Sequence, residues 1–344
     1  MRKTAIFVIY FICSLYVFLL GVRQPNIDGY ERARFGEMVQ GTAHRPFVYR
    51  TLLPSVIRGI ESLVPDSAEE SLKQSIDRVF PFGKIINKMG WDEQYYFEYL
   101  IGLPLMLACL IAFMYSLSWL ARGLFAGPDW IFPLIAVAAM LVLPAMFRYY
   151  IYIYDFPTLL LFTLALALMA HRRWRWYYVV FVLAAINKET AILLAFFWMI
   201  LLRRERLRDP LKYWITAAAQ VMAFVAIKLV ITLIYLDNSG VPAEFNFLEH
   251  NFAILFSPHS VPGVISVIVI FILLFYRWRE KPQFLRLALL MGIPLLALGI
   301  FWGVIDEFRI FYEIYAVIWL LAGHTLSLMA GFGLEPRPNE WRLT

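Results

Sequence analysis

The chain has 344 residues, of which 61% are hydrophobic, 17% aromatic and only 16% charged. Soluble domains carry roughly 25% charged residues and under about 50% apolar ones, so a soluble fold of this length could not bury so much apolar surface. The net charge of +6 does not indicate nucleic acid, because Lys and Arg stand in short clusters between apolar runs. The two cysteines, Cys13 and Cys109, lie inside such runs, which argues against disulfides or a Cys-based metal site.

The apolar runs predict an all-α membrane protein of about ten transmembrane helices, forming a single domain over residues 1–344. The first run follows Met1-Arg2-Lys3 and exceeds the length typical of a signal peptide, with no small-x-small cleavage site behind it, so we expect an uncleaved helix. Lys and Arg concentrate in alternate loops, which predicts cytoplasmic N- and C-termini in a bacterial-type inner membrane. The runs fall at about 4–22, 98–120, 130–147, 156–170, 177–187, 190–202, 213–235, 262–276, 284–303 and 310–329.

The fifth and sixth runs have an alternative interpretation as one helix over 177–202. That helix would place Lys188 and Glu189 near the bilayer centre, at about 2.5–3.5 kcal/mol for a charged residue. It would also put the Arg clusters at 172–175 and 203–206 on opposite sides of the membrane. Two helices are therefore favoured. At 1.5 Å per residue they reach only about 16–20 Å, too short to cross alone, so we expect the turn at 187–190 to lie in an outward-facing cavity.

The longest outer loop, 23–97, is predicted to carry amphipathic helices that lie on the membrane interface. Asn26 or Asp28 can cap a first helix, and a second begins near Thr51. Between them, His44, Arg45, Tyr49 and Arg50 pack cations among aromatics and prolines. Arg is a bidentate partner for phosphate, so this segment predicts either an anion site or pairing with anionic lipid headgroups.

The other outer segments also carry charge. The aromatic turn from Arg148 to Asp155 ends in an acid that either caps the next helix or belongs to a site. Asp306 and Glu307 suit the start of the last helix, where Arg309 and Glu313 are spaced to pair. Lys228 either snorkels to the interface or faces the cavity. This gathering of ionisable groups predicts a polar ligand and acid–base chemistry, with a structural ion-pair network as the alternative.

These residues resemble the GT-C glycosyltransferases, polytopic enzymes that take sugars from polyprenyl-phosphate carriers at the outer membrane face. The stretch from Asp28 to Met38 resembles the acidic first loop of the protein O-mannosyltransferase and aminoarabinose transferase branch. Tyr154-Asp155 and Asn187-Lys188-Glu189-Thr190 resemble later outer turns of that superfamily. The resemblance covers about the first 235 residues.

The resemblance implies an inverting transfer from a polyprenyl-phosphate sugar to a lipid or glycan acceptor. Asp28 then matches the family's acidic residue, whose carboxylate accepts the proton of the acceptor hydroxyl as a base, with Glu31 assisting. The residues implied to bind the donor phosphate are Arg45, Arg50, Lys188 and Arg309. The remaining polar cavity residues are His44, Tyr49, Arg148, Asp155, Glu189, Lys228, Asp306 and Glu307. The first loop lacks an Asp-x-Asp pair, which weakens the case for a metal: no cofactor is firmly predicted, and a divalent metal stays an unsupported alternative.

Two other functional classes remain open. A transporter or flippase for a lipid-linked glycan would use a similar cavity, but no internal repeat is evident. An O-antigen ligase or polymerase would also work at the outer face on polyprenyl-linked sugars, and it would likewise rely on outer Arg and His residues. The segment with Glu249, His250 and His259 is an additional candidate for binding the acceptor.

Overall fold

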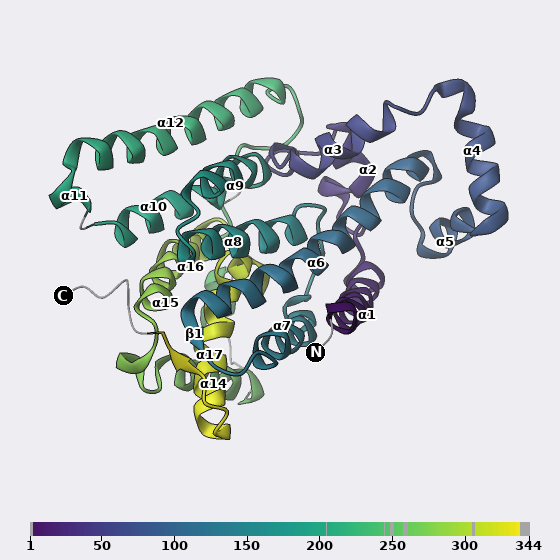
Figure 1. The fold of residues 1–344 in the computed structure, drawn as a ribbon. Coiled ribbons are helices and arrows are strands. Elements are labelled where there is room, and N and C mark those ends of the chain that lie inside the picture. The colour runs from purple at the N-terminus through teal and green to yellow at the C-terminus, as the bar shows by residue number, and fades with distance from the viewer. Residues whose placement is uncertain are drawn as a thin grey trace.

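The protein folds almost entirely into helices (Figure 1), and the computed structural model describes residues 3–203, 205–243, 245–247, 251–256, 261–304 and 307–337. The predictions for Glu249, His250, His259 and Asp306 fall outside these residues. Strands β1 (Phe125–Ala126) and β2 (Glu335–Pro336) pair antiparallel and connect the described C-terminal end to the end of helix α6 (Tyr96–Leu124). The all-α prediction is confirmed.

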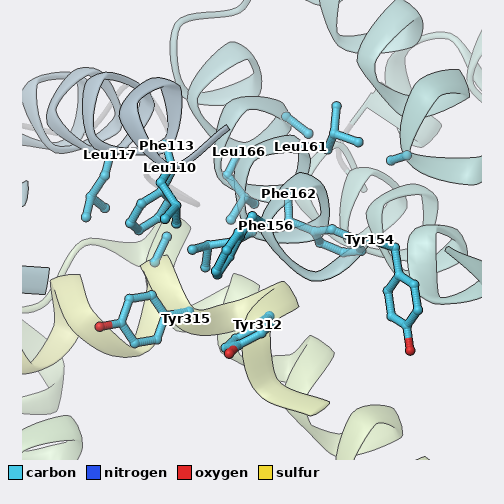
Figure 2. Packing of buried hydrophobic residues seen from close by; sticks show 14 of the residues in the cluster. Leu110, Phe113, Leu117, Tyr154, Phe156, Leu161, Phe162, Leu166, Tyr312 and Tyr315 are labelled. Carbon is cyan, nitrogen blue, oxygen red and sulfur yellow. The ribbon is translucent and has the colours of Figure 1, made fainter. Parts of the chain in front are cut away.

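Helices α6 (Tyr96–Leu124) and α8 (Asp155–Ala170) form the centre of the molecule and pack extensively on each other. Their shared side chains include Phe113, Phe156 and Phe162, each at most 1% exposed (Figure 2). In lipid, such helices associate through close packing more than through release of water, so interlocking side chains are the main source of cohesion. The helices packed beside them are α1 (Lys3–Gly21), α7 (Ile131–Val142), α9 (Trp174–Asn187) and, through its start, α17 (Tyr315–Ala330).

Five helices in the described chain are long and apolar enough to cross a membrane, and shorter apolar helices accompany them. This is the composition of a multi-pass membrane protein. A helix lies over each of the ten predicted apolar runs. The five long ones cover Lys3–Gln24, Glu93–Leu124, Pro210–Ile234, Gln283–Phe301 and Phe308–Ala330.

The first loop contains more helix than the sequence analysis expected. The expected first helix is reduced to the 3₁₀ turn η2 (Glu31–Ala33) and α2 (Phe35–Gln40), whereas the second is present as α3 (Leu52–Glu61). Two further helices were not predicted, α4 (Asp66–Val79) and α5 (Phe82–Met89), which stand to one side of the bundle (Figure 1). The loop is anchored where Phe35 packs over Gly102, because a Cβ at that position would overlap the Phe35 ring.

The chain breaks between the fifth and sixth apolar runs, as predicted. Helix α9 ends at Asn187, Lys188 is extended (φ −154°, ψ 148°), and the 3₁₀ turn η6 (Glu189–Ala191) leads into α10 (Ile192–Leu201). The Asn187 side chain, 1% exposed, donates to Thr158 Oγ1 at 2.8 Å. This hydrogen bond fixes the end of α9 against α8, so the turn has one defined direction.

The second half completes the bundle around this turn. Helix α12 (Pro210–Ile234) packs on α9 and α10, and α16 (Gly292–Phe301) packs on its flanking 3₁₀ turns. Helix α14 (Val261–Phe275) packs on α17. The remaining elements are short or connect these helices: η1 (Val22–Asn26), η3 (Phe47–Tyr49), η4 (Glu93–Tyr95), η5 (Leu143–Met146), α11 (Glu205–Arg208), α13 (Phe252–Phe256), η8 (Trp278–Glu280), α15 (Gln283–Ala288), η9 (Leu289–Met291) and η10 (Phe308–Ile314).

Candidate functional site

A cavity of about 750 Å³ lies at the 187–190 turn. Every predicted outer segment contributes to its lining: the first loop through Arg50, the aromatic turn through Tyr152, the broken helix through Lys188, the segment after α12 through Asn246, and the start of η10 through Arg309. Helices α12 and α16 supply the more apolar walls. We call this the charged cavity.

Arg50 and Glu189 form the ion pair that joins the first loop to the broken helix. Arg50 Nη2 lies 2.7 Å from Glu189 Oε1, and Arg50 Nε donates to Glu189 Oε2 at 3.4 Å. The guanidinium also covers the Tyr154 ring, 4.3 Å from its centroid, and Nη1 donates to the Tyr154 hydroxyl. The Glu189 side chain keeps 47% of its surface exposed because it faces the open cavity, so this pair can meet a ligand.

Lys188 and Glu313 form a second, more deeply buried pair. Lys188 Nζ lies 2.8 Å from Glu313 Oε1, which also accepts the Thr190 hydroxyl at 2.6 Å. The Glu313 side chain has no exposed surface, and its other oxygen, Oε2, has no partner among the described residues. The sequence spacing predicted that Glu313 pairs with Arg309. That prediction was wrong, because the turns of η10 direct Glu313 toward the 187–190 turn.

Arg309 joins the last outer segment to the aromatic turn. Its Nε lies 2.6 Å from Glu307 Oε1, and its Nη1 lies 3.6 Å from Asp155 Oδ2. The guanidinium stacks 4.0 Å from the centroid of Tyr152. Asp155 Oδ2 also accepts the backbone N–H of Tyr152 at 2.9 Å, so this acid both closes its own turn and faces the site. The site alternative for Asp155 therefore agrees with the geometry, whereas the cap alternative was wrong: Tyr154 stands at the N-cap of α8, and no side chain caps that helix.

Tyrosine rings form a continuous aromatic surface along the cavity. Tyr152 and Tyr154 stack with centroids 5.4 Å apart and an interplanar angle of 4°, and Tyr30 meets Phe47 at 5.4 Å. Figure 2 shows Tyr154 at the margin of the packed core, with its hydroxyl directed away from Phe156 and Phe162. Aromatic faces beside hydrogen-bonding groups are suited to a ligand that has both apolar and hydroxyl-bearing surfaces.

Lys228 faces the cavity from α12, so the cavity alternative for this residue agrees with the geometry. Its Nζ is buried and has no hydrogen-bond partner among the described residues. The tally of charged side chains in the described lining is four cations (Arg50, Lys188, Lys228, Arg309) against four carboxylates (Asp155, Glu189, Glu307, Glu313). Their formal charges cancel.

Several predicted site residues lie elsewhere in the described structure. Asp28 Oδ1 accepts the Phe35 N–H at 2.8 Å, so Asp28 fixes the start of α2 and does not line the cavity; Glu31 is exposed outside it. Arg45 donates to the carbonyls of Leu236 and Gly240, both at 2.8 Å. The residues of the prediction that do line the cavity are Tyr49, Arg50, Asp155, Lys188, Glu189, Lys228, Glu307 and Arg309, whereas His44 and Arg148 do not.

Asp28 nevertheless has the chemistry of a proton acceptor. Burial raises the pKa of its carboxyl, and the hydrogen bond from the Phe35 amide opposes this only in part. Tyr30, two residues further on, does line the cavity.

The sequence analysis did not include Glu313 among the site residues, because it considered Glu313 only as a partner for Arg309. Within the described chain, no group of three or more His, Cys, Asp or Glu side chains is arranged to hold a metal ion. Comparison with known proteins found no match for this chain among family models, curated proteins or solved structures.

Proposed function

We propose that this chain is a membrane glycosyltransferase that moves a sugar from a polyprenyl-phosphate carrier to a lipid or glycan acceptor. The reaction takes place at the outer face of a bacterial-type inner membrane and inverts the anomeric carbon. The observation that carries the proposal is the charged cavity, which gathers Arg50, Lys188, Lys228 and Arg309 into one volume among apolar helices. Its volume of about 750 Å³ is in the usual range for a small-molecule site, about 300–1,000 Å³.

The cations suit the departure of a phosphate. When the acceptor oxygen bonds to the anomeric carbon, the bond from that carbon to the phosphate oxygen breaks, and the carrier phosphate leaves with the electron pair. Fixed cations stabilise the negative charge that develops there. Arg309 and Lys188 are held in place by carboxylates, so they need no reorganisation during the step.

The aromatic surface suits the sugar. Tyr152 and Tyr154 are buried beneath Arg309 and Arg50. The aromatic lining residues that keep exposed surface include Tyr30, Tyr49 and Trp302. A sugar ring stacked on such a face buries its C–H groups while its hydroxyls reach the surrounding polar groups.

Asp28 accepts the proton of the acceptor hydroxyl in this proposal, as the resemblance implies. Its raised pKa supports the role, because a base works best when its pKa approaches the operating pH. Asp28 itself does not line the charged cavity, whereas Tyr30, two residues further along the chain, does.

The test is a transfer assay with purified protein, radiolabelled polyprenyl-phosphate sugars and membrane extract. We expect sugar transfer that is lost in Asp28→Asn and kept in Glu70→Gln, a control on the exposed surface of α4. Movement of the intact carrier across the membrane without bond cleavage would contradict the proposal and favour a flippase.

A further inference from the structure

The outer end of α12 forms one wall of the charged cavity and lies along the edge of the bundle (Figure 1). Phe224, Lys228 and Thr232 line the cavity at intervals of four residues, so they share one face of the helix. Four apolar side chains on its other faces are each more than half exposed: Leu229, Val230, Leu233 and Ile234. Because these side chains do not pack on the described protein, polar contacts are needed to fix this end of α12.

Two polar attachments stand on either side of Lys228. The first is Gln220, 4% exposed, whose Oε1 accepts the Tyr177 hydroxyl of α9 at 2.8 Å. The second lies just beyond the helix, where residues 235–240 meet residues 41–45 of the first loop. We call this second contact the α12 clasp. Lys228 is eight residues from Gln220 and eight from Leu236, so it depends on both attachments.

Arg45 supplies one half of the α12 clasp. Its Nη1 donates to Leu236 O and its Nη2 to Gly240 O, both at 2.8 Å, and its backbone N–H donates to Ser239 O at 2.8 Å. The guanidinium thus lies at the carboxyl end of α12, where the helix dipole favours a cation.

Asn238 supplies the other half. Its Nδ2 donates to Gly41 O at 2.9 Å and to Ala43 O at 3.0 Å. The backbones also touch, since a Cβ at Gly240 would lie 2.6 Å from Arg45 O. Each of the two side chains therefore joins two carbonyls of the opposite segment, and removing either one breaks two contacts.

The position of Lys228 matters because its electrostatic neighbours have opposite charges. Glu189 attracts its ammonium group and Arg50 repels it, and these two neighbours form their own ion pair. Among the described residues, Lys228 Nζ has no hydrogen-bond partner that would fix it there. The place of this ammonium group in the cavity therefore follows the place of α12.

We propose that Arg45 and Asn238 are positioning residues, which act through the α12 clasp to hold Lys228 in the wall of the charged cavity. Neither residue belongs to the described lining. The part that Lys228 plays in sugar transfer rests on the proposed function, whereas its position is measurable without any transfer.

Acetylation of lysines in the full-length protein in detergent, read by mass spectrometry, measures that position. Arg45→Ala and Asn238→Ala each remove two side-chain hydrogen bonds, so labelling of Lys228 is expected to rise about tenfold as the end of α12 opens locally. Arg45→Lys keeps the cation and is expected to give an intermediate rise. Arg122→Ala is the control, because Arg122 pairs with Asp129 beyond the end of α6, and it is expected to leave Lys228 labelling unchanged.

Three other lysines in the same samples separate local release from unfolding. Lys281 is 2% exposed and reports on the bundle, Lys188 reports on the 187–190 turn, and the exposed Lys212 reports on the reagent. The rise is expected at Lys228 alone. Equal increases at Lys228 and Lys281 would mean that the clasp only stabilises the fold. Unchanged labelling of Lys228 would mean that the clasp does not hold it, and either result would overturn the proposal.

The transfer assay tests whether Arg45 acts through Lys228. If it does, the double variant Arg45→Ala/Lys228→Gln is expected to have the same donor KM as Lys228→Gln, because changes that act through one contact do not add. Additive increases in KM would show that Arg45 acts by another route and would overturn the proposal. A rise in Lys228 labelling in a protein that transfers no sugar would contradict the proposed function alone. Transfer together with unchanged Lys228 labelling would contradict the present inference alone.

Discussion

Two lysines whose ammonium nitrogens are buried, Lys228 and Lys281, differ in how many hydrogen-bond acceptors surround that nitrogen. Lys281, between η8 and α15, is 2% exposed, and its Nζ donates to Leu321 O at 2.6 Å, Thr325 Oγ1 at 2.7 Å and Leu273 O at 3.3 Å. Lys228 is half-buried in the wall of the charged cavity, and its buried Nζ donates to none of the described residues.

The difference separates a structural cation from one available to a ligand. Three acceptors satisfy the three donors of the Lys281 ammonium, and they come from two helices, α14 and α17, so this lysine joins elements and leaves no donor for a ligand. Among the described residues, Lys228 Nζ has no hydrogen-bond partner, and Lys228 lines the charged cavity. Burial alone does not identify a residue that binds a ligand. A buried polar group that has no hydrogen-bond partner is a stronger indication.

The largest expected effect comes from breaking the Lys188–Glu313 pair, the cavity's most buried contact. Glu313→Leu leaves Lys188 without its carboxylate and is expected to lower the free energy of unfolding by about 3–5 kcal/mol. Chemical denaturation in detergent measures this. The double variant Lys188→Met/Glu313→Leu is expected to recover much of the loss. Equal losses in the single and double variants would mean that the pair itself contributes little.

Removing one acceptor from Lys281 has the next largest effect. Thr325→Val keeps the shape of a residue with no exposed surface but deletes the hydroxyl at 2.7 Å. A buried donor left unsatisfied costs about 1–3 kcal/mol, so the thermal midpoint is expected to fall. Thr325→Ser retains the hydroxyl and is the control. If valine and serine behave alike, Lys281 does not depend on this contact.

The pH dependence of stability gives a third comparison. Burial lowers the pKa of Lys281 to about 8, against about 10.4 for an unfolded lysine. Between these values the unfolded state binds more protons, so Lys281 makes stability rise with pH. This contribution amounts to about 1 kcal/mol between pH 7 and pH 9. Denaturation curves of wild type and Lys281→Met, compared across that range, isolate it; identical pH slopes would contradict it.

The sequence was sufficient for the helices over the apolar runs and for most of the charged residues of the cavity, but it did not predict α4 and α5. Apolar runs located the long helices, and the cost of burying Lys188 and Glu189 indicated the break between α9 and α10. The ion pair between Lys188 and Glu313 could not be predicted from the sequence, because the two residues are 125 positions apart and meet only through the packing of helices. The resemblance directed attention to Asp28, whereas its contact with the Phe35 amide depends on a local turn that short motifs do not encode.

Lys228 itself gives the smallest expected change in stability, and the sign of that change is informative. Lys228→Met keeps the length of the side chain and removes a buried ammonium group that has no partner in the described chain. The free energy of unfolding is expected to stay within about 1 kcal/mol of wild type or to rise, because the desolvation cost disappears while no described hydrogen bond is lost. Lys212→Met, at an exposed position of the same helix, gives the baseline. A loss as large as that of Thr325→Val would show that Lys228 has a structural partner, as Lys281 does, and would remove the physical reason for assigning it to a ligand.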